Sequence, residues 1–564
     1  ITSNEAQACY DRIVLWIVSL ALQRIGLSAE AAFSMTNTLQ SATHDIATAF
    51  GISIDKYFPA HPPHQGSGQG NGAGPTIWVM ISAILLTIMR DEGFGLNALS
   101  CLSQLALVIA GFAFVDDTDI INAAPSVNTL GEDLLQQQQR VVDTWEGTLR
   151  ATGGALRPDK SYWYMIDYQH TANRWLYRSI DQIPGDITVK VSDGSRQPLL
   201  RLEPNQAKET LGIFISMDGN AKDQILHLLS KTRQMAEYLR TSRVGKKEAW
   251  YTFTAAFLKT IEYPMEATRL TKQQWEKVMS PLLSIALQKS GISQKFPRVM
   301  VYTAKQYHGL GILHPWYNQQ LKHLQTLIGE LANSTPTGIL LQASAEQLRL
   351  EIGLPGTFKD VPWDRFKKSL TSTWLTDLMF FLGDNDILLH DSLPQLHTQR
   401  QGDIFLMQCF LLSNPTDNEL RCLMDCREYL QVTTLEDITT VDGTEIMLQV
   451  WQGIMYKRKV SSFLWPRQPP HKHLNWDLWR ATLQPLIHNT HNRYLKFPLG
   501  RWESEALHHW KWFYSRTTNK LYAKHGQVYT SYVMINRGSR RNDGNYMKTT
   551  GFCQTLPQDL YEAD

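Results

Sequence analysis

Two adjacent carboxylates, Asp116 and Asp117, interrupt an apolar run that extends from Gly111 to Ile121. Apolar residues on both sides of the pair predict two strands joined by a tight acidic turn. Neighbouring ionised carboxylates repel each other, and a bound divalent cation would offset that repulsion. Asp is also a common turn residue. The pair alone therefore fits either a metal site or a solvated turn.

The length and composition describe a globular protein of more than one domain. A chain of 564 residues exceeds one hydrophobic core, and 43% hydrophobic with 19% charged residues is ordinary for such a protein. Six sparse cysteines favour a reducing, intracellular compartment, either nucleus or cytoplasm. Cys422 and Cys426 lack a further His or Cys pair nearby and are expected to be buried thiols rather than zinc ligands.

The sequence predicts no membrane partner. The longest uncharged apolar run, residues 76–89, is too short to cross a bilayer and suits a buried helix. The chain begins at Ile1 with residues typical of the middle of a domain, which suggests a fragment of a longer protein.

Periodicity divides the chain into expected elements. A possible strand at 7–10 precedes helical segments with apolar residues at helical spacing (Ile13, Trp16, Ile17, Leu20, Leu22, Ile25). Further on we expect a helix at 76–90, a helix at 134–149 with four glutamines on its solvent face, strands at 160–167 and 210–216, a hairpin turn at 193–194, and helices from 221 to 330. Proline-rich residues 465–470 mark a boundary before an aromatic tail.

A glycine-rich loop spans residues 61–75 and ends at Pro75, which suits the first turn of a helix. The loop lacks the Gly-Lys-Ser/Thr ending of a phosphate-binding loop. It fits a flexible linker, but a hinge that approaches a substrate closely is the better interpretation. Gln69 within it offers both a donor and an acceptor.

Five motifs in order, within about 210 residues, resemble the palm of a reverse transcriptase, most like non-LTR retrotransposon enzymes. Glu5 followed by Tyr10-Asp11 resembles motif A, although Asp11 also suits a helix N-cap. Gln69-Gly70 before Pro75 resembles motif B, and Phe114 to Asp117 resembles motif C. The stretch from Gly154 to Lys160-Ser161 resembles motif D, and Leu211-Gly212 resembles the primer-grip motif.

The resemblance implies an α+β fold: a right-hand polymerase palm, with an antiparallel sheet packed on helices, then a helical thumb and a mostly helical C-terminal region. The implied domains are 1–220 (palm, motifs A to E), 221–330 (thumb), 331–464 and 465–564. Two departures stand out. The family has Asp where Glu5 stands, and the fingers expected upstream of motif A are missing.

The implied function is RNA-directed DNA polymerisation, with an RNA template, a DNA primer, dNTPs and two Mg²⁺ (or Mn²⁺) ions. Glu5, Asp116 and Asp117 would be the metal ligands. Lys160 would lie near the triphosphate, although a solvated strand-end lysine is the alternative. The residues implied to bind the incoming nucleotide are Tyr10, Gln69, Gly70 and Phe114. The residues implied to bind nucleic acid are Leu211, Gly212, Lys246 and Lys247.

Charge is unevenly distributed. Residues 222–305 carry 15 Lys and Arg against 6 Asp and Glu, whereas the whole chain has a net charge of only +2. The expected thumb is therefore the basic segment, as phosphate binding requires. The tail from His508 mixes basic and aromatic residues and suits either single-strand binding or a small Trp-rich core with a basic edge.

Three other functions remain open. An RNA-dependent RNA polymerase shares the paired Asp, but Tyr10 as the sugar gate and Gln69-Gly70 argue against it. A decayed or truncated retroelement protein would bind nucleic acid without polymerising, as Glu5 and the missing fingers suggest. A group II intron maturase is the third.

Overall fold

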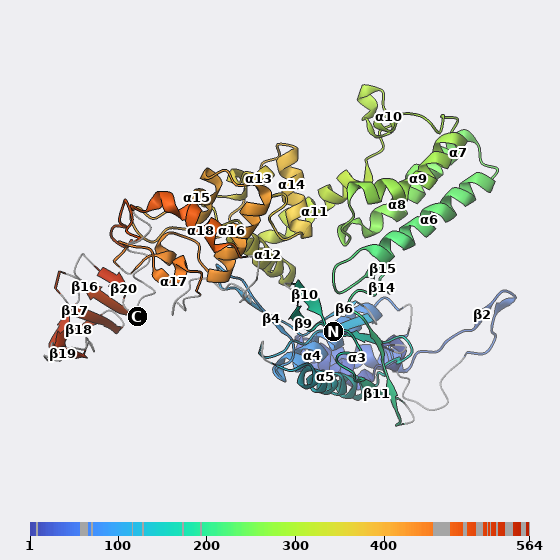
Figure 1. Ribbon diagram of the computed structural model, residues 1–564. Helices are drawn as coiled ribbons and strands as arrows, with labels where there is room; N and C mark the ends of the chain where they lie inside the picture. The colour runs from blue at the N-terminus through green and yellow to red at the C-terminus, as the bar shows by residue number, and fades with distance from the viewer. Residues whose placement is uncertain are drawn as a thin grey trace. The chain divides into compact units, whose positions relative to one another are not determined.

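The computed structural model describes most of the chain in two compact units (Figure 1). One unit contains residues 1–98 and 106–322, and the other contains 99–105 and 323–564. The described residues are 1–6, 9–56, 66–68, 71–114, 117–126, 129–171, 174–191, 194–440, 442–454, 474–488, 493–503, 511–515, 517–518, 520–525, 528–535, 545–553 and 560–562. Each unit is described by itself.

A five-stranded sheet organises the first unit, in the order β13-β8-β1-β7-β6. The strands are β1 (Thr2–Glu5), β6 (Gly111–Phe114), β7 (Asp117–Ile120), β8 (Tyr162–Tyr164) and β13 (Leu200–Leu202). The α+β class is confirmed. The expected antiparallel sheet is mixed, because β13 pairs parallel with β8. The two strands expected on either side of the acidic pair are confirmed as the antiparallel pair β6–β7. Residues 115 and 116 between them lie outside the described residues.

Helices cover one face of this sheet and supply its core. They are α1 (Cys9–Arg12), α2 (Leu15–Arg24), α3 (Ala29–Gln40), α4 (Gly74–Asp91) and α5 (Gly131–Ala151). Among the described residues α4 is the one helix long and apolar enough to cross a membrane. A buried core helix passes the same test of length and composition, and Ile77, Ile81 and Leu85 of α4 belong to the hydrophobic core.

Two expectations about the first 25 residues are wrong. The first strand is β1, not 7–10, and residues 9–12 form a helical turn in which Asp11 is the third residue rather than a cap. The apolar pattern missed β1 because its inward side chains are polar: Asn4 accepts from Trp145 Nε1 (3.1 Å) and donates to the Thr118 carbonyl (2.9 Å). On α2 the expected apolar face is partly right: Leu22 is buried as expected, but Trp16 is 61% exposed and Val18 is buried instead.

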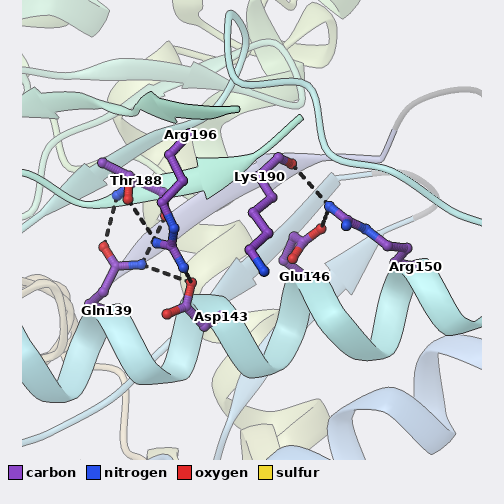
Figure 2. Close-up of polar contacts among 7 residues, drawn as sticks. All are labelled: Gln139, Asp143, Glu146, Arg150, Thr188, Lys190 and Arg196. Atoms are coloured by element: carbon purple, nitrogen blue, oxygen red, sulfur yellow. Dashed lines mark hydrogen bonds and ion pairs between the residues drawn. The ribbon is translucent and has the colours of Figure 1, made fainter. Parts of the chain in front are cut away.

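The helix α5 binds a neighbouring hairpin through polar side chains (Figure 2). The hairpin strands are β11 (Thr188–Lys190) and β12 (Arg196–Pro198), and their antiparallel pairing confirms the expected hairpin. Of its two expected turn residues, Asp193 lies outside the described residues and Gly194 has a positive φ of 85°. Gln139 exchanges two 2.9 Å hydrogen bonds with the Thr188 backbone, and Asp143 pairs with Arg196 at 2.9 Å (Figure 2). The glutamines are therefore not all solvated, and Gln138 is buried against Thr2.

Short strand pairs and helices complete the first unit. The strands are β2 (Ala47–Thr48), β3 (Gly51–Ile52), β4 (Leu96–Leu99), β5 (Ala106–Ile109), β9 (Tyr168–Thr171), β10 (Arg174–Tyr177), β14 (Lys208–Thr210) and β15 (Ile213–Ile215). As expected, residues 221–330 are mostly helical: α6 (Lys222–Thr241), α7 (Lys246–Thr252), α8 (Leu258–Glu262), α9 (Lys272–Lys289), α10 (Arg298–Tyr302) and α11 (Pro315–Leu331). The division between the two units falls within α11, after Lys322. A core around Trp275 and Leu282 packs these helices together.

The second unit is largely helical and ends in an antiparallel sheet of order β19-β18-β17-β16-β20. Its helices are α12 (Pro336–Ile352), α13 (Trp363–Phe366), α14 (Trp374–Asp384), α15 (Leu406–Leu412), α16 (Asp417–Leu430), α17 (Leu448–Trp451) and α18 (Trp476–Leu483). Its strands are β16 (Trp512–Ser515), β17 (Lys520–His525), β18 (Val528–Ile535), β19 (Asn545–Cys553) and β20 (Leu560–Glu562). Cys426 is buried, and Cys422 is partly buried.

Candidate functional site

The N-terminal sheet has one buried face and one open face, and the acidic residues lie on the open one. Thr2 and Asn4 of β1 and Thr118 and Ile120 of β7 are buried, while the residues between them are partly exposed. Glu5 stands directly opposite Asp117 in the antiparallel register. Because directly opposite residues project from the same face, the two carboxylates share the open face.

Aromatic residues flank these carboxylates on the edge strand β6. Phe114 stands opposite Asp117, and Phe112 stands opposite Asp119. Their side chains are 60% and 52% exposed. Exposed aromatic rings beside carboxylates give this face both a cation-binding and a stacking character.

Lys160 reaches the same face from another segment. Its Nζ lies 2.5 Å from Glu5 Oε1, and the two side chains are both partly exposed. The backbone holds this segment in place, because Arg157 N donates to the Glu5 carbonyl at 3.0 Å and Leu156 bridges to Ala6. Lys160 therefore lies beside Glu5, and its implied place near the triphosphate stays a prediction.

The described part of the glycine-rich loop packs against Tyr10. Ser67 N donates to the Tyr10 carbonyl at 2.7 Å, and Gly66 has a positive φ of 81°. A Cβ on Gly66 would lie 2.4 Å from the Tyr10 carbonyl oxygen, and one on Gly74 would lie 3.2 Å from the Tyr10 ring. The expected close approach exists, but its partner at Gly66 and Gly74 is the chain itself.

Leu211 and Gly212 form a hairpin turn rather than the interior of the strand expected at 210–216. Their φ angles are 50° and 80°, and they join β14 to β15. A two-residue turn with both φ angles positive fits the right-handed twist of a hairpin, but it strains a leucine. The Tyr263 hydroxyl donates to the Leu211 carbonyl at 2.8 Å and holds this turn.

The hairpin β14–β15 adjoins the open face of the sheet. Tyr162 stands opposite Ser3 of β1, and its hydroxyl lies 3.2 Å from Thr210 Oγ1. The Lys208 ammonium lies 5.8 Å from the centre of the Tyr162 ring. The strained turn is therefore anchored beside the strand that carries Glu5.

Three residues of this face were not singled out from the sequence: Ser3, Asp119 and Tyr162. Ser3 stands opposite Asp119 in the register. Burial raises the pKa of Asp119, and hydrogen bonding with Ser3 opposes the rise. The period-two spacing from Glu5 to Ser3 and from Asp117 to Asp119 is the signal that could have found the first two.

Three predicted site residues, Asp116, Gln69 and Gly70, lie outside the described residues. Within the described part of the chain, no three His, Cys, Asp or Glu side chains gather to hold a metal ion. Glu5, Asp116 and Asp117 were predicted to lie close together. The structure sets Glu5 opposite Asp117, and the prediction for Asp116 stays untested.

The two predicted nucleic-acid-binding lysines lie at the start of α7, where both Lys246 and Lys247 are exposed. Together with Lys305 they line a cavity of about 420 Å³ in the helical region. Lys305 was not singled out from the sequence.

Comparisons with known proteins add nothing to the geometry of the open face as evidence for function. No protein-family model and no curated protein matches the chain.

Proposed function

We propose that the protein is an RNA-directed DNA polymerase whose nucleotidyl-transfer site is the open face of the N-terminal sheet. The observation that supports this most strongly is the register that sets Glu5 opposite Asp117. Phosphoryl transfer depends on positioned charge rather than on covalent help from the protein. Two facing carboxylates on rigid strands supply such charge.

The donor set suits divalent magnesium or manganese. Glu5 and Asp117 offer carboxylate oxygens on one face, and Asp116 would complete the set from the turn. A bound Mg²⁺ or Mn²⁺ would neutralise charge on the transferring phosphate and favour deprotonation of the primer hydroxyl. Lys160 would hold the Glu5 carboxylate in position through the 2.5 Å ion pair.

Other residues would position the substrates. Tyr10, braced by Gly66 and Gly74, would lie beneath the sugar and exclude a 2′-hydroxyl. The resemblance assigns the incoming nucleotide to Gln69 and Gly70 as well. Phe114 is exposed for stacking, and the Leu211-Gly212 turn would contact the primer. The basic helices with Lys246 and Lys247 would contact phosphates of the RNA–DNA duplex.

A second function is nucleic-acid binding without polymerisation, in a decayed or truncated retroelement protein. The observation in its favour is that Glu5, where the family has Asp, already pairs with Lys160. A misplacement near 1 Å can lower a rate by about a hundredfold.

Primer extension on an RNA template tests these functions. With Mg²⁺ and dNTPs we expect extension by the unchanged chain, and a loss of about a thousandfold in Asp117→Asn and Asp116→Ala, because metal charge is worth several kcal/mol to the reaction. Asp181→Asn, at an exposed loop residue, is the matched control. NTP incorporation would indicate an RNA polymerase. Extension by Glu5→Asp alone would favour the decayed protein, and unchanged activity in Asp117→Asn would refute the site.

A further inference from the structure

The cavity in the helical region is lined by three lysines and by apolar residues. Lys246 and Lys247 line it from α7, and Lys305 lines it from the loop after α10. Trp250 and Leu310 supply the apolar wall. Its volume of about 420 Å³ lies within the range of small-molecule sites.

Two glycines leave room for the lysine side chains. A Cβ on Gly291 would lie 2.9 Å from Lys246 Cδ, and a Cβ on Gly311 would lie 2.8 Å from Lys305 Cγ. Both glycines have positive φ angles, 79° and 72°. The lysine stems therefore pass closely over glycine backbone, which limits their freedom before any ligand arrives.

The charge of the cavity is not neutralised by ion pairs in the described part of the chain: none is found there for Lys246, Lys247 or Lys305. The carboxylate nearest in sequence to Lys246 and Lys247 is that of Glu248. Its side chain folds back over Gly245 at the start of α7, where a Cβ on Gly245 would lie 2.3 Å from Glu248 Oε2. Three ammonium groups facing one cavity repel each other, and a multiply charged anion would relieve that repulsion.

A buried hydroxyl gives an independent indication of a ligand. Ser290 lines the cavity, and its Oγ is buried without a hydrogen-bond partner among the described residues. A buried polar atom without a partner destabilises a fold, so such atoms are uncommon. A rotation of the Ser290 side chain toward the cavity would let an acceptor oxygen of a ligand satisfy this hydroxyl.

We propose that this cavity binds a nucleotide, with its phosphate held by Lys246, Lys247, Lys305 and the Ser290 hydroxyl. The sugar or base would pack against Trp250 and Leu310. The proposal rests on the proposed function at Lys246 and Lys247, which would also contact the duplex, but none of the cavity residues lies on the acidic face, so binding here can be measured without the metal-dependent reaction. The nucleotide is either free or part of a single strand, since both present the same phosphate and ring.

Calorimetric titration of the full chain tests nucleotide binding to the cavity. EDTA in the buffer removes divalent metal and so prevents metal-dependent binding at the acidic face. One arm uses ATP, and the other uses a ten-residue oligothymidylate at several salt concentrations. Each arm compares the unchanged chain with Lys246→Gln and Lys305→Gln. Lys277→Gln is the matched control, because Lys277 is an exposed lysine of α9 outside the cavity.

If the nucleotide is free, ATP binds, and each cavity variant weakens its affinity by about tenfold while Lys277→Gln does not. If it belongs to a strand, the oligonucleotide binds, and the slope of log K against log salt falls by about 0.7 for each cavity lysine removed. Ser290→Ala would weaken binding about threefold without changing the slope.

Equal affinities and slopes in the cavity variants and in Lys277→Gln would overturn the proposal, as would a lack of binding by both ligands. Neither result would bear on the polymerase site, because EDTA removes the metal on which that site depends.

Discussion

Charged side chains occupy two contrasting settings in this protein. On the open face of the N-terminal sheet, Glu5 and its partner Lys160 both remain partly exposed. In the second unit Glu346 is fully buried and accepts from Leu102 N, Ser103 N, Ser103 Oγ and Gln342 Nε2. A carboxylate that protein donors already satisfy is structural, whereas one on an open face can still bind a ligand.

The same unit buries further charges. Arg349 pairs with Asp391 at 2.7 Å with both side chains almost inaccessible, and the fully buried Arg427 donates to the Leu350 carbonyl at 3.0 Å. The carboxylates of the candidate site therefore differ from the structural ones of the second unit in being partly exposed to solvent. Substitutions on the open face should change activity, and substitutions of the buried groups should change stability.

Of the two carboxylates, Glu5 and Glu346, Glu5 should have the larger effect on activity. Glu5→Gln removes a charge from the open face and should lower the rate of dNTP incorporation about a hundredfold, with little change in melting temperature. Single-turnover primer extension and thermal unfolding measure the two quantities. The control is Glu351→Gln, a partly exposed carboxylate of α12 that accepts from Thr371. Equal rates of dNTP incorporation in Glu5→Gln and Glu351→Gln would show that Glu5 has no special role in the reaction.

Glu346→Ala should act on stability instead. Removing the carboxylate leaves the partly buried amides of Leu102 and Ser103 without an acceptor, at a cost of about 3 kcal/mol. Hydrogen exchange of residues 99–105 should speed up strongly, whereas in Glu351→Ala it should not. Unchanged protection of residues 99–105 would show that Glu346 does not hold this segment.

The pH dependence of the Glu346 contribution has a definite sign. Burial raises the pKa of Glu346, but hydrogen bonds from Ser103, Leu102 and Gln342 outweigh it, so its pKa lies below the ordinary value. Its stabilising effect is therefore complete above about pH 4 and is lost as the pH falls below that value.

Asp403 should show the opposite dependence. Burial raises the pKa of Asp403 to about 7, and the nearby carboxylates of Asp437 and Glu436 add to the rise. Between about pH 4 and pH 7 the folded state binds more protons than the unfolded state, so stability falls as the pH rises. Asp403→Asn should stabilise the second unit at pH 8 by on the order of 2 kcal/mol and have little effect at pH 4.

Thermal unfolding from pH 4 to pH 8 measures this difference. The control is Asp360→Asn: hydrogen bonds from Thr357 lower the pKa of the exposed Asp360, so this variant should destabilise the protein at neutral pH. If Asp403→Asn and Asp360→Asn shift stability in the same direction at pH 8, the assignment of Asp403 is wrong.

The smallest effect should come from Leu211. Asn tolerates the left-handed region better than Leu, so Leu211→Asn should stabilise the fold by about 0.5–1 kcal/mol. Gln431, which ends α16 in the same backbone region, provides the control Gln431→Asn. Both variants should raise the unfolding midpoint, but only Leu211→Asn should weaken primer extension. Equal activity in the two variants would remove the proposed role of the turn.

Local patterns predicted much of the fold. Apolar runs predicted the hairpin β6–β7, Pro75 predicted the start of α4, and helical periodicity predicted the region from 221 to 330. Tertiary contacts decided the rest. Strand β1 buries the polar Asn4 against Trp145, and no apolar alternation reveals such a strand. Residues 99–105 belong to the second unit because Glu346 binds them from far along the chain.

The candidate site was predictable where motifs carry it. Glu5, Asp117 and Lys160 were singled out from the sequence, and the structure brings Glu5 beside both of the others. The Leu211-Gly212 turn was expected as a strand because Leu rarely adopts a positive φ. Lys305 joins the basic cavity only through folding, from a point about 60 residues beyond Lys246.

Binding of Mn²⁺ to the full chain tests the open acidic face most directly. Electron paramagnetic resonance of free Mn²⁺ during a titration gives the number and affinity of the bound ions. We expect binding by the unchanged chain, a loss of at least about tenfold in affinity in Glu5→Gln and in Asp117→Asn, and no loss in Glu346→Gln. Identical Mn²⁺ affinities in all four proteins would contradict the account.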